Sequence, residues 1–381
     1  MQLKVSQKLL DKAIKSVAKA VPAKGIQPIL NNIYLKTLQE KLLLNATDLD
    51  FWIEATIPSQ NQAEGAVAIS AKKIEEISSK FSDEELNLHM EDEKKVLEIG
   101  SEKIKFDLIG LPGDDFPAFE KPDLTGQDFI TINRQEFLSL INVVQISASR
   151  FDLNNILGGI YIGIKETEEK EYFLEFASSD GGRLSAYSLK LDNLGENPSF
   201  ANKAVIVPIK IILDVQKILD TSVDDNVQIA FLSSQVVFKT EDRYVVSRIL
   251  EGEYPNYMEL VPGGHDKKAV VSRKDFQAAL DRVAVMANEV TNMVKLSFKE
   301  NQMTLECSNL DFGNATETLE INEYEGSELE INFNVRFIMD FLKVIDSDNV
   351  VIYMNANESP ALIKPETGNE YIYVIMPLKS V

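Results

Sequence analysis

The feature that most constrains the fold of this chain is a plan of five elements that recurs three times in the same order. Each copy begins with a helix that follows a residue suited to capping it, at Ser6, at Asn133 and at Ser272. A single recurring feature could arise by chance, whereas five in one order indicate an internal triplication. The chain is therefore expected to fold as three similar units.

A strand with alternating apolar side chains follows each first helix. It is expected at Ile29–Leu35, at Ile156–Ile162 and at about Met293–Phe298. A further strand then enters a polar turn and leaves it as another strand. The three turns read Thr47-Asp48-Leu49-Asp50, Ser179-Asp180-Gly181-Gly182 and Ser308-Asn309-Leu310-Asp311. Such Asp, Asn and Gly residues between strands are typical of β-hairpins.

A second helix, entered directly from a strand, is expected in each copy at Ala71–Phe81, Ile209–Leu219 and Val335–Ile345. Each carries two basic residues seven positions apart, and this spacing places them on one helix face. The pairs are Lys73 with Lys80, Lys210 with Lys217, and Arg336 with Lys343, the first being one residue out of register. Each copy then ends near an aromatic residue or Met before Pro, at Phe116-Pro117, Tyr254-Pro255 and Met376-Pro377.

Polar linkers that contain Pro and Gly separate the copies, at 120–128 and at 261–268. The predicted domains are 1–123, 129–261 and 269–381. Each has two helices and many short, mostly alternating strands, so the predicted fold class is α+β with antiparallel sheets. A chain of 381 residues is long enough for two or three such domains.

The first helix carries a stripe of four lysines, Lys8, Lys12, Lys15 and Lys19, opposite an apolar face. The whole chain has a formal net charge of −21, which normally argues against a nucleic-acid partner. Exposed charges more than about 8 Å apart are largely screened at physiological salt, so a local basic face can still bind phosphate. A lysine stripe can also be a merely solvated helix face, but basic residues on helices of all three copies favour a polyanion partner.

Several classes of protein are not expected. No apolar run reaches membrane-spanning length, and the start, Met1-Gln2-Leu3, lacks the apolar core of a signal peptide. The only cysteine, Cys307, rules out a disulfide framework and favours a cytoplasmic location. With two distant histidines, His89 and His265, no zinc site and no cofactor are expected.

No motif of nucleotide hydrolysis, metalloprotease or serine-hydrolase chemistry occurs, so no catalytic residue is predicted. Asp48 and Asp50 could hold a metal, which leaves a metal-dependent nuclease as one alternative. A shared turn-capping role for these aspartates is the more economical interpretation. A triplicated scaffold unrelated to DNA is the other alternative. Cys307 is expected to be buried, and Trp52 to lie in a core or interface.

The whole chain resembles one family, the bacterial DNA polymerase sliding clamps, which are the β subunits of the DNA polymerase III holoenzyme. The resemblance is carried by Gln27-Pro-Ile-Leu-Asn-Asn-Ile, Asn45-Ala-Thr-Asp-Leu-Asp, Leu111-Pro-Gly-Asp-Asp-Phe-Pro, Ser179-Asp-Gly-Gly-Arg-Leu, Leu250-Glu-Gly-Glu-Tyr-Pro-Asn-Tyr and Tyr373-Val-Ile-Met-Pro-Leu. It implies a head-to-tail homodimer that forms a ring around duplex DNA, without sequence specificity. The implied peptide-borne partners are the DNA polymerase III catalytic subunit, the clamp loader, repair polymerases and mismatch-repair proteins.

Three sets of site residues follow. The predicted DNA-facing residues come from the helix faces and, for Lys24 and Arg150, from the resemblance: Lys8, Lys12, Lys15, Lys19, Lys24, Lys73, Lys80, Arg150, Lys210, Lys217, Arg273, Arg336 and Lys343. The resemblance implies a peptide pocket of Leu157, Ser179, Gly181, Gly182, Arg183, Leu184, Pro255, Leu260, Val374, Met376, Pro377 and Leu378. It also implies a dimer interface of Lys103, Lys105, Phe106 and Leu108 against Val285 and Met286, with the lysines facing Asp311 or Glu317.

The sequence departs from the family pattern near the pocket. Gly182 stands where the family usually has His, and Glu259 stands where a basic residue is common. Ser380-Val381 extends the usual tail. These departures bear on peptide affinity and not on the overall resemblance.

Overall fold

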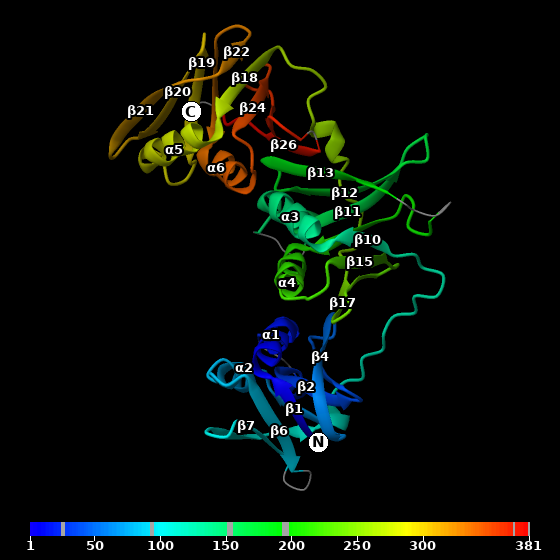
Figure 1. The fold of residues 1–381 in the computed structure, drawn as a ribbon. Helices are drawn as coiled ribbons and strands as arrows, with labels where there is room; N and C mark the ends of the chain where they lie inside the picture. The colour runs from blue at the N-terminus through cyan, green and yellow to red at the C-terminus, as the bar shows by residue number, and fades with distance from the viewer. Residues whose placement is uncertain (24–26, 92–94, 151–154, 193–197, 369, 380–381) are drawn as a thin grey trace. The chain divides into compact units, whose positions relative to one another are not determined.

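The computed structural model describes residues 1–23, 27–91, 95–150, 155–192, 198–368 and 370–379 (Figure 1). The strands pair antiparallel throughout the described sheets, and the fold is α+β as predicted. Contacts divide the chain into two compact units. Unit 1 comprises Met1–Leu138, Asn197–Phe200 and Lys210–Ile249; unit 2 comprises Ser139–Glu196, Ala201–Ile209 and Leu250–Val381.

The element order of the first repeat is strand, helix, four strands, helix and three strands. Two short 3-10 turns, η1 (Ala18–Ala20) and η2 (Pro28–Asn31), follow the first helix. The elements are β1 (Gln2–Ser6), α1 (Gln7–Val17), β2 (Asn32–Leu38), β3 (Lys41–Thr47), β4 (Phe51–Ala63), β5 (Ala66–Ser70), α2 (Ala71–Ser78), β6 (Glu85–Glu91), β7 (Val96–Gly100) and β8 (Lys105–Ile109), with β9 (Leu111–Pro112) and η3 (Gly113–Asp115) after them.

The second repeat follows the same order, again with two 3-10 turns, η4 (Gln145–Ser147) and η5 (Ile156–Gly158), after its first helix. Its elements are β10 (Ile130–Asn133), α3 (Arg134–Val144), β11 (Gly159–Glu166), β12 (Tyr172–Ser179), β13 (Arg183–Leu191), β14 (Ala204–Pro208), α4 (Ile209–Asp220), β15 (Asn226–Phe231), β16 (Gln235–Lys239), β17 (Arg243–Arg248) and the turn η6 (Tyr257–Leu260).

The third repeat follows the same order of helices and strands, with one 3-10 turn after its first helix and one added short strand, β22 (Glu323–Glu325), before the fourth strand. Its elements are β18 (Lys267–Ser272), α5 (Arg273–Val283), η7 (Ala284–Met286), β19 (Met293–Lys299), β20 (Gln302–Asn309), β21 (Gly313–Glu320), β23 (Leu329–Asn334), α6 (Val335–Val344), β24 (Asn349–Met354), β25 (Ala361–Pro365) and β26 (Tyr371–Ile375). Three copies of one element order confirm the predicted triplication.

Unit 1 contains one large sheet that crosses from the first repeat into the second. Its main path runs β10-β15-β16-β17-β4-β1-β6-β7-β8, and β4 pairs with β17 so that Trp52 lies opposite Val246. The linker after Pro117 contacts this joint, because the ring of Phe119 stacks on that of Trp52 at 4.9 Å between centroids. Trp52 is thus a packing residue, as predicted.

Unit 2 contains the equivalent joint between the second and third repeats. Its nine-stranded sheet runs β14-β11-β12-β13-β26-β25-β24-β18-β22, and β13 pairs with β26 so that Leu184 lies opposite Val374. A second sheet runs β21-β20-β19-β23. Its core includes Cys307, which is 1% exposed as predicted, and burial raises the pKa of its thiol to about 11.

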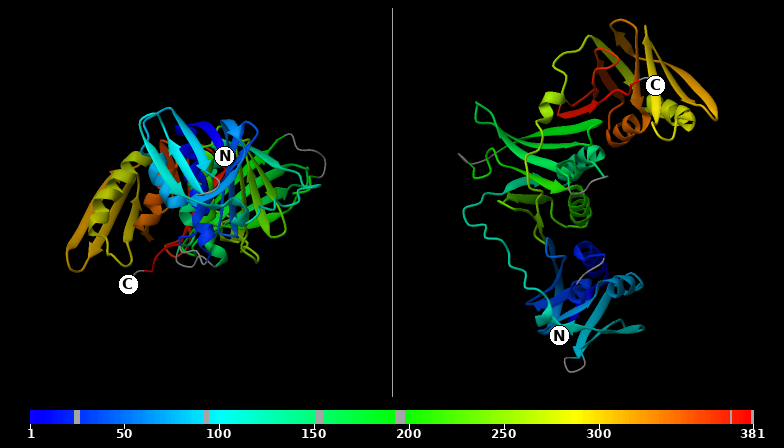
Figure 2. Two further views of the ribbon diagram at one scale, coloured as in Figure 1. Left: turned by 90° about the horizontal axis from the view of Figure 1, so that it is seen from below. Right: turned by 180° about the vertical axis from the view of Figure 1, so that it is seen from behind.

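In the first and third repeats two helices cover one face of a sheet with their apolar sides. Leu10, Ala13, Ile14 and Val17 of α1 are fully buried, and α1 lies beside α2 (Figures 1 and 2). In the third repeat Phe276, Leu280, Ile338 and Phe341 do the same for α5 and α6, which also lie side by side. Burial of these apolar helix sides stabilises the fold by about 25 cal/mol per Å² of apolar surface. It therefore determines which face of each helix remains exposed to solvent.

Three local predictions need correction. The strands expected from Ile29 and Ile156 begin three residues later, because Pro28–Asn31 and Ile156–Gly158 form 3-10 turns. The first helix, expected to carry the lysine stripe as far as Lys19, changes to a 3-10 turn after Val17. Ser6 occupies the N-cap position of α1, but its side chain makes no capping hydrogen bond. None of the described helices is long and apolar enough to cross a membrane.

Candidate functional site

The lysine stripe of α1 meets the basic residues of α4 in unit 1. Lys8 and Lys15 are exposed, whereas Lys12 and Lys19 are half-buried. Ser16, on the buried side of α1, hydrogen-bonds through its hydroxyl to that of Thr221, just after α4, at 3.0 Å. This contact holds the two helices together at the joint.

Asp214 of α4 marks the centre of this basic region. Burial raises the pKa of its carboxyl, and the nearby charges of Lys210, Lys19 and Lys217 act against that rise. Lys210 and Lys217 are themselves exposed. The structure therefore brings predicted DNA-facing residues from two different repeats around one carboxylate.

Acidic side chains lie next to basic residues of α2 and α1. Lys73 is exposed, and its Nζ lies 2.9 Å from Oε2 of Glu76; the hydrogen bond from Lys73 is the main reason that the pKa of Glu76 is lowered. Lys80 is exposed at the end of this segment. Lys15 of α1 is similarly paired, with 2.7 Å between its Nζ and Oδ2 of Asp11. These pairs reduce the local positive charge available to a phosphate.

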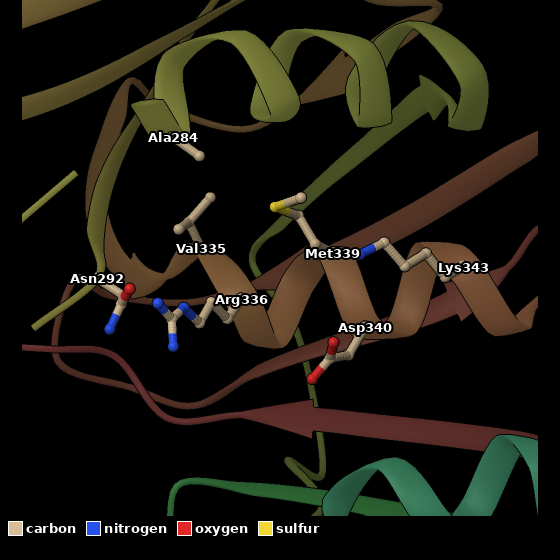
Figure 3. Close-up of a pocket in the computed structure, with 7 residues that line it drawn as sticks. All are labelled: Ala284, Asn292, Val335, Arg336, Met339, Asp340 and Lys343. Carbon is tan, nitrogen blue, oxygen red and sulfur yellow. The ribbon is translucent and has the colours of Figure 1, made fainter. Parts of the chain in front are cut away.

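The basic residues of α6 border a cavity of about 390 Å³ between α6 and η7 (Figure 3). Arg336 and Lys343 lie at its rim, and both are exposed. Val335 and Met339 point from α6 toward η7 and α5 and supply its apolar floor. Asp340 lies between the two cations on the same helix.

Arg273 has a different role from the predicted one. Its Nε donates to the carbonyl of Ser347 at 2.8 Å and its Nη1 to the carbonyl of Leu342 at 3.4 Å, at the end of α6. In the second repeat Arg134 donates in the same way to Asp224 and Leu219. In the first repeat Gln7 donates to Ser78. This position therefore clamps one helix end to the next helix, and the guanidinium of Arg273 is occupied by carbonyl groups.

Arg150 is exposed after η4. Lys24 lies outside the described residues.

The turn of the predicted peptide pocket has the same hydrogen bonds as its counterpart in the first repeat. Oδ1 of Asp180 accepts from the backbone N–H groups of Gly182 and Arg183 at 3.0 and 3.1 Å. Oδ1 of Asp48 accepts from those of Asp50 and Phe51 at 3.1 and 2.7 Å. The predicted turn-capping role of these aspartates is confirmed, and it accounts for Asp48 without a metal.

The central residue of each turn has a positive φ. Gly181 has φ +86° and Leu49 has φ +83°. A glycine adopts this conformation without strain, whereas a leucine does so at a cost on the order of 1 kcal/mol. Gly181 also leaves open space, because nothing lies within 4 Å of where its Cβ would be.

The strand ends at this joint form an apolar patch next to the turn. Leu184 and Val374 are buried there in a cluster with Tyr257. Met376 is 38% exposed and Leu260 45% exposed, which leaves apolar surface for a ligand. The other predicted pocket residues surround this patch, with Ser179 buried, Leu157, Pro377 and Leu378 half-buried, and Pro255 exposed. All of them belong to unit 2, which brings three distant segments together.

Arg183 connects the turn to α6, a relation that sequence reasoning missed. Its Nε donates to Oδ2 of Asp180 at 3.0 Å, its Nη1 to Oδ2 of Asp340 at 2.8 Å, and its guanidinium lies 4.2 Å from the ring centre of Phe337. The same ring lies 3.0 Å from the position that a Cβ of Gly182 would take. Phe337 thus fills space that a side chain at position 182 would need.

Both predicted interface segments are sheet edges with exposed apolar side chains. Among the residues that the structure describes, β8 pairs only with β7, and β21 only with β20. Ile109 beside Leu108 is 84% exposed, and Phe312 before β21 is 75% exposed. Val285 is 79% exposed, Met286 packs against the core of the third repeat, and Phe106 packs edge-on against Phe81. The alternating pattern of 101–108 identified the first edge, whereas no pattern in the sequence pointed to Ile109 or Phe312.

One lysine and one acid of these edges, Lys105 and Glu317, already have ionic partners within the chain. Lys105 lies 2.5 Å from Oε2 of Glu98, while Lys103 is exposed. Glu317 accepts hydrogen bonds from the guanidinium of Arg282.

Three family profiles match the chain one after another. They are the DNA polymerase III beta subunit N-terminal domain over residues 1–120, the central domain over 131–256 and the C-terminal domain over 258–379. A beta sliding clamp of Synechococcus elongatus is 29% identical over 385 residues, which cover 100% of this chain and 99% of the relative.

Solved structures agree along the whole length. The sliding clamp (DNA polymerase III subunit beta) from Pseudomonas aeruginosa bound to griselimycin is 25% identical with a TM-score of 0.91, and 100% of each chain is covered. The C. crescentus beta sliding clamp, with polyethylene glycol bound at a region suggested for beta-motif tethering, is 28% identical with a TM-score of 0.88 and the same coverage.

Proposed function

The chain belongs to the DNA polymerase III beta subunits, the bacterial sliding clamps, and we propose that two copies of it close head to tail into a ring around duplex DNA. As a sliding clamp it is a non-catalytic processivity factor of DNA replication, and neither the nuclease nor the unrelated scaffold is supported. The repeated geometry of the joints carries the proposal of ring closure.

The two joints within the chain use the same hydrogen bonds at equivalent positions. Across the first joint the backbone N–H of Arg248 donates to the carbonyl of Asp50 at 3.0 Å. Across the second, the N–H of Met376 donates to the carbonyl of Gly182 at 2.9 Å. In the third repeat the residue equivalent to Asp50 and Gly182 is Phe312, which directly precedes β21 as they precede β4 and β13. A third joint of this kind needs a strand from another copy.

The strand β8 offers the matching edge. The N–H of Gly110 donates to the carbonyl of Lys95, and that of Ser101 donates to the carbonyl of Ile104. Hydrogen-bonded pairs alternate along an antiparallel ladder, so the backbone groups of Lys105, Asp107 and Ile109 point away from β7. The N–H of Ile321 donates to the carbonyl of Asn301, so the same alternation makes the backbone groups of Phe312, Asn314 and Thr316 point away from β20. The equivalence pairs these groups with Ile109, Asp107 and Lys105 of a second copy. The equivalence with the two joints within the chain and the alternation of hydrogen bonds along each edge strand thus give the same register of β8 against β21.

This register brings exposed apolar groups together. Ile109 would lie opposite Phe312 of the second copy, and Leu108 and Phe106 would lie opposite its Gly313 and Ala315. The exposed Val285 would stand near the same contact, as the dimer prediction requires. A heterologous contact that closes on itself in this way removes both unpaired edges.

We propose that the ring holds DNA through phosphate contacts from the helix faces, with the predicted basic residues except Arg273, whose guanidinium clamps α6. Such contacts are independent of base sequence and weaken steeply with salt, which suits a sliding tether. We also propose that the cleft around Gly181, Leu184 and Met376 receives short peptides from the polymerase catalytic subunit, the clamp loader, repair polymerases and mismatch-repair proteins. Exposed Met and Leu side chains suit apolar anchor residues from several partners.

The domain boundaries 1–123, 129–261 and 269–381 remain a proposal, supported by the repeated element order. A cytoplasmic location is proposed on the ground that a bacterial clamp must reach chromosomal DNA.

The deciding experiment is loading onto nicked circular DNA with the cognate clamp loader, followed by linearisation. A ring stays on the circle through gel filtration and slides off once the DNA is cut. Retention on linear DNA, or failure to remain on the circle, would contradict the proposal.

A further inference from the structure

Asp340 lies on α6 in a stripe with two predicted DNA-facing cations. Arg336, Asp340 and Lys343 fall at i, i+4 and i+7, and all three line the same cavity (Figure 3). The Asp340 side chain is 40% exposed, so the carboxylate contributes to the charge of this helix face. An acid at this place weakens phosphate binding unless another group neutralises it.

The group that neutralises Asp340 belongs to the peptide cleft. Arg183 Nη1 donates to Asp340 Oδ2 at 2.8 Å, and the Arg183 side chain is only 11% exposed. The guanidinium is held from three sides, by Asp180, by Asp340 and by the ring of Phe337. The backbone of Phe337 is fixed in turn, because its carbonyl accepts from the Tyr373 hydroxyl at 2.8 Å. Asp340 is therefore the one anchor of Arg183 that also belongs to a DNA-facing stripe.

We propose that Asp340 is a positioning residue for the peptide cleft and couples peptide binding to DNA binding. The inference rests on the proposed function of both sites. While Asp340 holds Arg183, α6 presents Arg336 and Lys343 to DNA. When a peptide draws the guanidinium toward itself, the carboxylate pairs instead with Arg336 or Lys343, its neighbours at i−4 and i+3. A bound peptide then weakens DNA retention, and by linkage DNA weakens peptide binding by the same factor.

The chain supplies a matched control on α4. Lys210, Asp214 and Lys217 have the same spacing as Arg336, Asp340 and Lys343, and the charges that act on Asp214 are those of Lys210, Lys19 and Lys217. Asp214→Asn and Asp340→Asn each remove one negative charge from a DNA-facing stripe. Both should therefore strengthen DNA retention and steepen its dependence on salt by up to about one per added phosphate contact. Only Asp340→Asn should affect the cleft.

The experiment uses the full-length dimer and a labelled peptide from the C-terminal tail of the cognate polymerase. Asp340→Asn should lower the peptide Kd about fivefold, the scale of one partly exposed ion pair, because the peptide no longer has to draw Arg183 away from a carboxylate. Asp340→Glu should return the Kd to within about twofold of the wild-type value, since a carboxylate is present again. Asp214→Asn should leave it unchanged. The half-life on nicked circular DNA, with and without saturating peptide, should fall with peptide in the wild type and not in Asp340→Asn.

The outcomes separate the inference from the proposed function. Unchanged or weaker peptide affinity in Asp340→Asn, or an equal gain in Asp214→Asn, overturns the inference while the clamp assignment stands. The same peptide effect on DNA half-life in the wild type and in Asp340→Asn overturns the coupling. A wild-type dimer that binds neither probe overturns the proposed function and the inference with it. Urea unfolding of each variant shows that the compared proteins are folded.

Discussion

Asp107→Pro should break the ring without unfolding the chain. The backbone N–H of Asp107 points away from β7, since the hydrogen-bonded pairs of that ladder include Gly110 with Lys95 and Ser101 with Ile104. Proline removes only this outward N–H and is tolerated on an edge strand. The sheet of one copy keeps its hydrogen bonds, whereas the proposed pairing with β21 of a second copy loses one and meets the proline ring.

The expected effect is large because a closed ring contains two such joints. Losing one N–H···O bond costs about 1 kcal/mol, and a proline ring facing a neighbouring strand adds about 2 kcal/mol. Two joints then lose roughly 6 kcal/mol, which corresponds to about a 10⁴-fold weaker dimer. Asp107→Ala keeps the N–H and is the matched control, with an expected change of less than about tenfold.

Sedimentation over a wide range of protein concentrations measures this effect. Asp107→Pro should sediment as a monomer where Asp107→Ala and wild type are dimers, and all three should have the same circular dichroism spectrum. A dimer of Asp107→Pro as tight as that of Asp107→Ala would refute the proposed strand pairing and its register.

Four further predictions concern DNA, the cleft and stability. Lys12→Glu combined with Lys15→Glu should shorten the half-life of the clamp on circular DNA. It should also reduce the slope of log affinity against log salt concentration by roughly two per protomer, because about one slope unit accompanies each phosphate contact. Lys36→Glu on β2 should change neither quantity. Deleting Met376–Val381 should abolish binding of a polymerase-tail peptide and leave a ring that still encircles DNA; unchanged peptide affinity would disprove the cleft. Arg273→Ala should lower the free energy of unfolding by about 2 kcal/mol in urea with an unchanged salt slope, and Arg273→Gln should lose less, since Gln7 makes the equivalent bond in the first repeat. Asp214→Asn should unfold at a higher temperature than wild type at pH 7 and at the same temperature near pH 3. Burial raises the pKa of Asp214, so the stability of the wild type falls as the pH rises from the ordinary aspartate pKa through the raised one. An equal difference in unfolding temperature at both pH values would contradict this.

The sequence alone determined the features that depend on local periodicity and capping. The three copies, their two helices each, the lysine stripe and the aspartate-capped turns were all predicted and are present, because apolar spacing and turn chemistry act within a few residues. The family was identified from short motifs on the same principle, and the profile matches confirm it. The errors in strand starts at Ile29 and Ile156 are also local, since Pro28 and Asn155 favour a 3-10 turn there.

Only the tertiary structure decided the partner of each charged group. Arg273 and Arg336 both looked like exposed bases on a helix, yet the first is bonded to carbonyls about 70 residues away in sequence and the second is exposed. Arg183 meets Asp340 across 157 residues, and no spacing rule reaches that far. The free edges of β8 and β21 are likewise a property of the finished sheets. The partner of each charged side chain and the free edges of the sheets depend on which chain segments pack together. That packing is determined by burial of the apolar surface of the whole chain, to which the functional residues contribute little.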